Sequence, residues 1–262
     1  LFQPAEEGGG GGRRMVEDGC LDGRVIGPPI DRMFGLHGWP SSPIGVVSTK
    51  EGPLFAASDR FEIAVRGHGG HAAWPEMCRD PIVAASAVVQ AIQSIVSRNV
   101  APQDPAVVSV TRFDAGTSFN IIPDGAVLQG TVRTLRTEVQ ELVRQRLGEI
   151  VQQVSAAHGC DATFEYIVNY PVMVNDGAAA ETVGRIAAEA FGSERSRLAE
   201  QPEMVGEDFA FYGQRIPACF FLLGLRPPGA TSMPSLHHPR FDFNDEAIAP
   251  GIEMFVRLAL AG

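Results

Sequence analysis

Two adjacent carboxylates near the start of the chain, Glu6 and Glu7, are the first residues whose placement suggests chemistry. A short apolar run ended by a proline precedes them, and the five glycines 8–12 follow. We expect the run to be the end of a buried strand and residues 13–19 to form a short helix that a glycine ends. Ligands of open α/β sheets bind at the carboxyl ends of strands, so the pair is a candidate site. A solvated acidic pair in a loop is the alternative.

Histidines occupy similar places farther along the chain. His37 ends the apolar run 33–37, which we expect to be a strand with a polar residue at its carboxyl end. His237 and His238 lie in a predicted loop beyond the apolar strand 219–223. Histidine and carboxylate together suit zinc or another borderline divalent metal, although these long spacings form no local signature. A buried histidine satisfied by a backbone carbonyl is the alternative for His37.

Composition limits the possible partners. The 262 residues are 45% hydrophobic, which is typical of one or two soluble globular domains. No apolar run approaches the ~20 residues of a membrane span, so we expect no membrane partner. A net charge of -10 without a basic cluster argues against a nucleic-acid partner. Four separated cysteines without a C-x-x-C pair fit a reducing compartment, and we expect a cytoplasmic protein. They are Cys20, Cys78, Cys160 and Cys219.

The middle of the chain has its own pattern of elements. Residues 61–65 alternate between apolar and polar, which is typical of a half-buried strand. We predict further strands over 106–112, 126–135 and 162–168, and helices that begin after residues 80 and 137. The order β-α-β-β-α-β is the ferredoxin-like arrangement, a four-stranded antiparallel sheet with two helices on one face. We therefore expect residues 59–168 to form a domain inserted into the chain.

The two helices of this segment carry recognisable end signals. Asp80 and Pro81 are suited to be the N-cap and the first residue of the first helix. Its polar residues form one stripe, so we expect most of this helix to be buried. Thr137 and Gln140 predict a capping box at the start of the second helix, and Gly159 ends that helix.

The flanking segments, 1–58 and 169–262, are predicted to form one α/β domain around the candidate residues. Glu207 and Asp208 stand at a predicted helix start, where acidic side chains are favourable. Support of the site is an equally good role for these two acids. Asn244 is suited to cap the final helix.

Eight motifs, taken in order, resemble one family over the whole chain. They are F-Q-P-A-E-E-G-G-G-G, G-L-H-x-W-P, G-G-H-A-A-x-P, D-P-I, S-F-N-I-I-P-D, G-T-V-R-T-L, G-E-D-F and L-H-H-P-R-F. The chain looks like the amidohydrolase branch of the co-catalytic zinc metallopeptidases, which includes hippurate hydrolases, N-acyl-amino-acid amidohydrolases and plant auxin-conjugate hydrolases. The resemblance implies a partial zinc-peptidase-like, mixed α/β catalytic domain whose inserted domain is a lid.

The resemblance also implies roles in the first and last segments. Glu6 matches the catalytic acid that takes a proton from the attacking water and passes one to the leaving amine. Glu7, His37 and His237 match metal ligands, whereas the family's motif varies at His238. The implied cofactors are divalent metal ions, two in the full-length protein, of zinc, manganese, cobalt or nickel.

In the lid, His71 matches a histidine that polarises the scissile carbonyl and stabilises the oxyanion. In dimeric relatives this histidine reaches the active site of the partner subunit. Asn120 and Arg133 match positions that hold the substrate's carboxylate or carbonyl. The alternatives without a catalytic role are a plain loop histidine for His71, a turn residue for Asn120 and a solvated strand residue for Arg133. His68 and Glu76 depart from close relatives, which often carry a basic residue and a histidine there.

The implied function is a metal-dependent amidohydrolase that cleaves N-acyl amino acids of the hippurate type. We expect a homodimer formed through the lid, or a tetramer. The chain begins at Leu1 and lacks the motif H-A-C-G-H-D, which supplies further ligands in this branch, so we expect missing upstream sequence. Three ligands can hold one catalytic zinc but cannot complete a two-metal centre. The alternative is a truncated, catalytically inactive remnant that retains ligand binding or dimerisation.

Overall fold

The computed structural model describes residues 1–25 and 27–261. The chain divides into two compact units. Unit 1 consists of Leu1–Phe55, Met173–Glu203 and Glu207–Gly262, and unit 2 of Ala56–Val172 and Met204–Gly206. The predicted inserted segment 59–168 falls inside unit 2.

Unit 1 is built on a mixed sheet with the strand order β1-β12-β2-β11. Its strands are β1 (Met33–Pro43), β2 (Val47–Thr49), β11 (Ser196–Leu198) and β12 (Ala218–Arg226). β12 lies parallel to β1 and antiparallel to β2, and β2 lies parallel to β11. A second, two-stranded sheet pairs β3 (Gly52–Phe55) with β10 (Met173–Asn175). All of β12 except its last residue is buried, which confirms the buried strand predicted from the continuous apolar run.

Helices surround this sheet in unit 1. They are α1 (Gly11–Glu17), α4 (Gly177–Phe191), α5 (Ala210–Gly213) and α6 (Ile248–Leu260), with the 3₁₀ turns η3 (Ser193–Arg195) and η4 (Asp245–Ala247). Residues of α4 and α6 share one core cluster with β12, whereas α5 belongs to a second cluster. Asn244 caps the 3₁₀ turn η4 by accepting the backbone N–H of Glu246 at 3.2 Å, and not the final helix α6 as predicted, because η4 precedes that helix and the N-cap of α6 is Ala247.

The predicted closure of α1 is confirmed in detail. Gly19 has a φ of 86°, in the left-handed region that glycine adopts without strain. Its N–H donates to the carbonyl of Val16 at 3.1 Å, and the N–H of Cys20 donates to Met15 at 3.1 Å. This pair of hydrogen bonds is the Schellman motif, which satisfies the last carbonyls of a helix.

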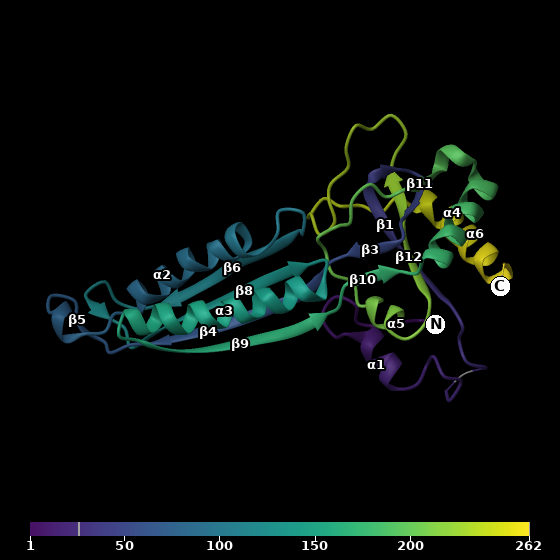
Figure 1. Cartoon of the computed structure of the whole chain (residues 1–262). Coiled ribbons are helices and arrows are strands. Elements are labelled where there is room, and N and C mark those ends of the chain that lie inside the picture. The colour runs from purple at the N-terminus through teal and green to yellow at the C-terminus, as the bar shows by residue number, and fades with distance from the viewer. Residues whose placement is uncertain (26, 262) are drawn as a thin grey trace. The chain divides into compact units, whose positions relative to one another are not determined.

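Unit 2 has the ferredoxin-like arrangement predicted from its element order. Its sheet has the order β6-β8-β4-β9 with every neighbouring pair antiparallel. Its elements are β4 (Ala57–Arg66), α2 (Pro81–Ser94), the π-helical turn η2 (Ile95–Asn99), β6 (Ala106–Ala115), β8 (Gly125–Thr134), α3 (Thr137–Ala157) and β9 (Asp161–Tyr170). A small antiparallel pair, β5 (Gly70–His71) with β7 (Ile121–Ile122), and the 3₁₀ turn η1 (Pro75–Met77) complete the unit. Figure 1 shows α2 and α3 running along the sheet and β5 at one end of this unit.

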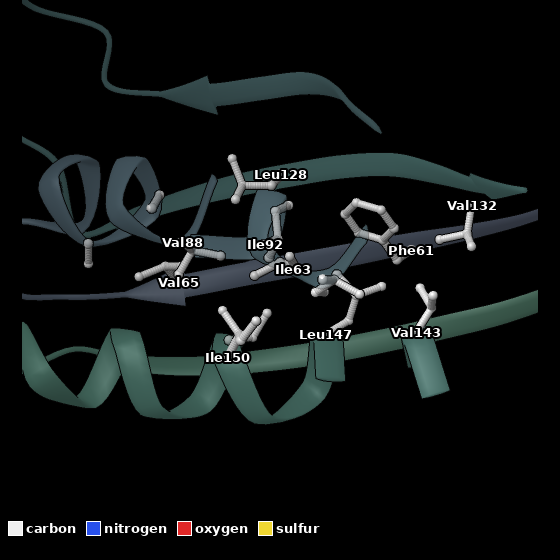
Figure 2. Close-up of a cluster of buried hydrophobic side chains, with 14 of the residues drawn as sticks. Phe61, Ile63, Val65, Val88, Ile92, Leu128, Val132, Val143, Leu147 and Ile150 are labelled. Atoms are coloured by element: carbon white, nitrogen blue, oxygen red, sulfur yellow. The ribbon is translucent and has the colours of Figure 1, made fainter. Parts of the chain in front are cut away.

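The core of unit 2 lies between the sheet and the two helices. Figure 2 shows side chains from β4 and β8 directed toward those of α2 and α3. The labelled members are Phe61, Ile63, Val65, Val88, Ile92, Leu128, Val132, Val143, Leu147 and Ile150, all buried. Burial alternates along β4 and β8, as the sequence pattern predicts.

Two predictions for unit 1 are wrong. Residues 1–5 form no strand, and the side chain of Phe2 is fully exposed, because no other strand in the described part of the chain pairs with this segment. His37 does not end a strand: pairing with β12 continues through Trp39, and β1 ends only at Pro43. The continued pairing places His37 in the middle of the strand.

Two details predicted for the helices of unit 2 are also wrong. Thr137 and Gln140 form no capping box, because the Gln140 amide donates instead to the buried carboxylate of Asp59 at 2.6 Å. Only one face of α2 is buried, and Ile82 and Val83 on another face are exposed. The predicted N-cap of α2 is confirmed, since the Asp80 side chain accepts two backbone N–H groups of the first turn.

The stretch Pro81–Asn99 is long and apolar enough to cross a membrane by length and composition alone. Core helices of globular proteins pass the same test, and the buried face of α2 belongs to the core of unit 2. We therefore assign it to that core. The four cysteines are free and buried.

Candidate active site

Glu6 and Glu7 lie on a tightly folded loop, residues 3–12, which we call the acidic loop. The carbonyl of Ala5 accepts the N–H groups of Gly9 at 3.0 Å and Gly11 at 3.4 Å, which folds the loop back on itself. A Cβ on Gly11 would lie 1.6 Å from the carbonyl oxygen of Pro4, so only glycine fits there. The glycine run therefore allows a turn too tight for other residues.

Three acidic side chains meet beneath this loop. Carboxylate oxygens of Glu6, Glu207 and Asp208 lie within 4.8 Å of one another, the only such group of three or more potential metal ligands among residues 1–25 and 27–261. Asp208 is completely buried, and Glu207 nearly so. The carboxylate of Asp208 accepts the side-chain amide of Gln3 and the backbone N–H of Gly12, the latter at 2.9 Å.

This crowding shifts the proton affinities of two carboxyls. Burial raises the pKa of Glu6 above its ordinary value, and the charges of Asp208 and Glu7 raise it further. A hydrogen bond from the Asp208 backbone and the nearby His237 act in the opposite direction. Burial raises the pKa of Glu207 to about 8, although its carboxylate accepts the N–H of Phe209 at 3.1 Å. Without a bound metal, Glu207 therefore carries a proton at neutral pH, which removes one negative charge from the cluster.

The three predicted metal ligands line one cavity of about 410 Å³ in unit 1. Glu7 comes from the acidic loop, His37 from β1 and His237 from the loop after β12. His238 lines the same cavity, together with the apolar side chains of Leu225, Leu236, Phe241 and Phe243. The structure thus brings together residues that are up to 230 positions apart, as 237 minus 7 gives.

The two imidazoles His37 and His238 have opposite hydrogen-bonding states. Nδ1 of His37 lies 2.8 Å from the carbonyl oxygen of Gly38, which can only accept, so Nδ1 carries the hydrogen and Nε2 keeps a lone pair. Nδ1 of His238 accepts the backbone N–H of Arg240 at 3.0 Å, so its hydrogen resides on Nε2. His37 is therefore prepared to ligate a cation through Nε2, and His238 is not.

Backbone strain in the described part of the chain is confined to this region. Ala5 and His237 are the non-glycine residues with positive φ among those described, at 57° and 61°. Such conformations cost of order 1 kcal/mol or more and persist only where the surroundings enforce them. One of these residues directly precedes Glu6 and the other is a candidate ligand.

The donor types suit a divalent metal, but the ligand atoms of Glu7, His37 and His237 do not all lie within 4.8 Å of one another in this structure. One carboxylate and two imidazoles around a single cavity are the ligands that zinc and similar borderline ions take. The hydrogen bond of His37 to a backbone carbonyl is the type of outer contact that orients ligating histidines. Glu7, His37 and His237 would hold the ion.

Removal of a candidate ligand is expected to weaken metal binding. His37→Ala and His237→Ala should each lower the affinity of the metal-stripped protein for Zn²⁺ or Mn²⁺ by at least about 10- to 100-fold, measured by isothermal titration calorimetry. His238→Ala is the matched control from the same cavity and should bind as the wild type does, because its Nε2 carries a hydrogen. Equal losses in all three variants would contradict the assignment.

The three predicted site residues of unit 2 do not lie together. His71 in β5 pairs with Ile121 in β7, and the N–H of Ala72 donates to the carbonyl of Asn120 at 3.1 Å, so His71 and Asn120 are neighbours. Both are exposed. Nδ1 of His71 accepts the N–H of Ala73 at 3.1 Å, which leaves the hydrogen on Nε2, where it can be donated to an oxygen.

Arg133 lies at the other end of the unit 2 sheet. β8 begins at Gly125, next to β7, and the stretch from Gly125 to Arg133 spans about 27 Å at about 3.4 Å per residue. Nη1 of Arg133 donates to the carbonyl of Val132 at 3.0 Å and to the hydroxyl of Thr131. Burial lowers the pKa of this guanidinium, and the charge of Asp59 opposes that shift, but arginine remains charged.

The main elements that sequence reasoning missed are the partners of the acidic loop. From the sequence, Asp208 and Glu207 could either begin a helix or support the site. In the structure they precede the short helix α5, and they also lie against the acidic loop. Gln3 and Gly12 received no role. The available signal was that Gln3 lies inside F-Q-P-A-E-E-G-G-G-G, that Gly12 directly follows this motif, and that Asp208 lies inside G-E-D-F.

Unit 1, with a cavity lined by one carboxylate and histidines, and the ferredoxin-like unit 2 define an α/β protein with a candidate divalent-metal site. The family described as peptidase family M20/M25/M40 matches residues 1–261, and the chain belongs to this family. The resemblance seen in the sequence motifs is thereby confirmed.

Curated relatives and solved structures agree with this membership. The chain is 38% identical to the N-acetylcysteine deacetylase of Bacillus subtilis (strain 168), covering 99% of this chain and 65% of the relative. It is 36% identical to the hippurate hydrolase of Campylobacter jejuni, again covering 99% of this chain and 65% of that protein. A crystal structure of the Bacillus subtilis YXEP protein, described as a dinuclear metal binding peptidase from the M20 family, matches with a TM-score of 0.78 and 33% identity over 99% of this chain and 63% of that one. The chain therefore spans just under two thirds of these proteins.

Proposed function

We propose that this chain works in a metal-dependent amidohydrolase that cleaves the amide bond of N-acyl amino acids, releasing a carboxylate and a free amino acid. The observation that carries the proposal is the cavity lined by Glu7, His37 and His237, with Glu6 on the same loop as Glu7. Named hydrolases of amides among the relatives support it. The cofactors are divalent ions, two in the full-length protein, of zinc, manganese, cobalt or nickel.

Glu6 is the general base and acid of the proposed reaction. When bound, a divalent metal lowers the pKa of water and polarises the substrate carbonyl. Glu6 takes the proton of the attacking water and later delivers a proton to the nitrogen of the leaving amine. Burial and neighbouring charge raise its pKa, which makes its carboxylate a better proton acceptor than an exposed glutamate.

The proposed roles in unit 2 concern the substrate. Nε2–H of His71 donates to the carbonyl oxygen as negative charge develops on it. Arg133 binds the carboxylate of the amino-acid part, because a partly desolvated guanidinium anchored through Nη1 presents a fork suited to two parallel hydrogen bonds. Asn120, beside His71, is proposed to hold a carbonyl or carboxylate oxygen.

The separation within unit 2 supports a homodimer through this lid. β8 extends about 27 Å from Gly125, which follows β7, the partner strand of His71, to Arg133, and this is more than one N-acyl amino acid can span. If His71 and Arg133 both contact one substrate, they come from two copies of the chain. β6 is an edge strand, and exposed apolar side chains stand on it and on neighbouring α2, a surface that a second copy can cover. These exposed apolar side chains are Ile82, Val83 and Phe113. The alternative to the dimer is a tetramer.

A substrate panel tests the proposal. The full-length gene product, loaded with Zn²⁺ or Mn²⁺, is expected to hydrolyse hippurate or N-acetyl amino acids, with the free amino acid measured by amine derivatisation. A cytoplasmic location is part of the proposal, and it is supported by the four free, buried cysteines, which fit a reducing compartment. Absence of hydrolysis across acyl groups and metals would overturn the proposal and favour a protein that only binds ligand or dimerises.

A further inference from the structure

The acidic loop is fastened at both ends to one side chain. Gln3 and Gly12 stand at the two ends of the loop, with Glu6 and Glu7 between them. The Gln3 amide donates to Oδ1 of Asp208, and the Gly12 N–H donates to Oδ2 at 2.9 Å. A single carboxylate, about 200 positions away in sequence, thus bridges the two ends.

The burial of Asp208 makes its hydrogen bonds important for the position of the acidic loop. Asp208 is fully buried, and a buried carboxylate is costly unless its oxygens accept hydrogen bonds. Two donors to these oxygens come from the acidic loop, and the side chain of Glu207 also hydrogen-bonds Asp208. Displacement of the loop would therefore leave a buried charge without these partners, so the loop is held in place.

The space around the glycines shows where the loop is held. A Cβ on Gly12 would lie 2.7 Å from the backbone oxygen of Asp208 and 3.0 Å from Oε1 of Gln3, so this end sits directly on residue 208. A Cβ on Gly8, just after the two acids, would meet nothing within 4 Å. The loop is anchored at its end and open near its middle. The backbone N–H of Asp208 also hydrogen-bonds the carboxylate of Glu6.

We infer that Asp208 is a positioning residue, which holds Glu6 in reach of the substrate by fastening both ends of the acidic loop through Gln3 and Gly12. This inference rests on the role proposed for Glu6. A base displaced by about 1 Å can lose about 100-fold in rate, so fastening the loop affects kcat without a direct contact to substrate. The effect on KM is small, because the side chains proposed to bind substrate lie outside the loop.

Polarity-reversed variants test the inference. Gln3→Glu places two carboxylates in opposition and is expected to lower kcat about 10- to 100-fold while KM for hippurate stays within about twofold. The double variant Gln3→Glu/Asp208→Asn restores a hydrogen bond of reversed direction, from the asparagine amide to the new carboxylate, and should recover most of the loss. Recovery of kcat would show that the contact between residues 3 and 208 sets the rate, whereas a double variant as slow as Gln3→Glu would contradict the inference.

Glycine variants and hydrogen exchange complete the test. Gly12→Ala should lower kcat in the same way, whereas Gly8→Ala, its matched control in the same loop, should not. In the metal-free protein, amide hydrogen exchange of residues 4–12 should be faster in Gln3→Glu and Gly12→Ala and unchanged in Gly8→Ala. Wild-type kcat and exchange in Gln3→Glu would overturn the positioning role alone. A wild type that hydrolyses no N-acyl amino acid would overturn the proposed function on which it rests.

Discussion

Replacement of Glu6 by glutamine is expected to lower kcat about 100- to 10,000-fold, the range that general acid–base catalysis supplies. The amide has nearly the same size and can still accept the backbone hydrogen bond from Asp208. It cannot accept a proton from water or return one to the leaving amine. The loss should therefore appear in kcat, measured with hippurate and with N-acetyl amino acids.

The control for this substitution is Glu17→Gln, on the exposed end of α1, where the carboxylate only pairs with Arg13 on the surface. It should hydrolyse both substrates at the wild-type rate. Metal affinity of Glu6→Gln should remain close to that of the wild type, because the candidate ligands are Glu7, His37 and His237. Equal activity of Glu6→Gln and wild type would remove the proposed role of Glu6.

The second large effect is expected for His71→Ala, about a 100- to 1,000-fold loss of kcat, typical of removing one donor to a developing oxyanion. The hydrogen bond from Ala73 leaves Nε2–H of His71 free to donate to such an oxygen. His158→Ala, an exposed histidine at the end of α3, is the control and should be fully active. A wild-type kcat in His71→Ala would show that His71 is a plain loop histidine without a catalytic role.

Mixing the two inactive variants distinguishes a histidine of the same subunit from one supplied by a partner. If His71 acts in the partner's site, dissociated and reassociated Glu6→Gln and His71→Ala chains form hybrid dimers in which one site has both residues intact. Equal amounts should then recover about one quarter of wild-type activity, since about half of the dimers are hybrids with one good site each. If each chain supplies its own His71, the mixture stays inactive.

Local patterns predicted unit 2 well. Alternation along β4 and β8 and the Asp80 cap are properties of short stretches, and the structure has them where the sequence places them. The failure of the Thr137 capping box has a tertiary cause. Gln140 reaches the buried Asp59, whose position on β4 is not visible from the helix sequence. A buried carboxylate without donors is more costly than an uncapped helix start.

For the candidate site, the sequence by itself determined residue types: two adjacent acids before glycines, and histidines in ordered motifs. Only the tertiary structure decided that Glu7, His37 and His237 line one cavity, since Glu7 and His237 are 230 positions apart in the sequence, as 237 minus 7 gives. β1 continues beyond His37 because it pairs with β12, and the five-residue apolar run 33–37 could not predict this longer strand. The tertiary structure also decided that Asp208 accepts hydrogen bonds from both ends of the acidic loop. Hydrogen bonds between distant segments produce no periodic pattern in the sequence of either segment, so the sequence could not predict them.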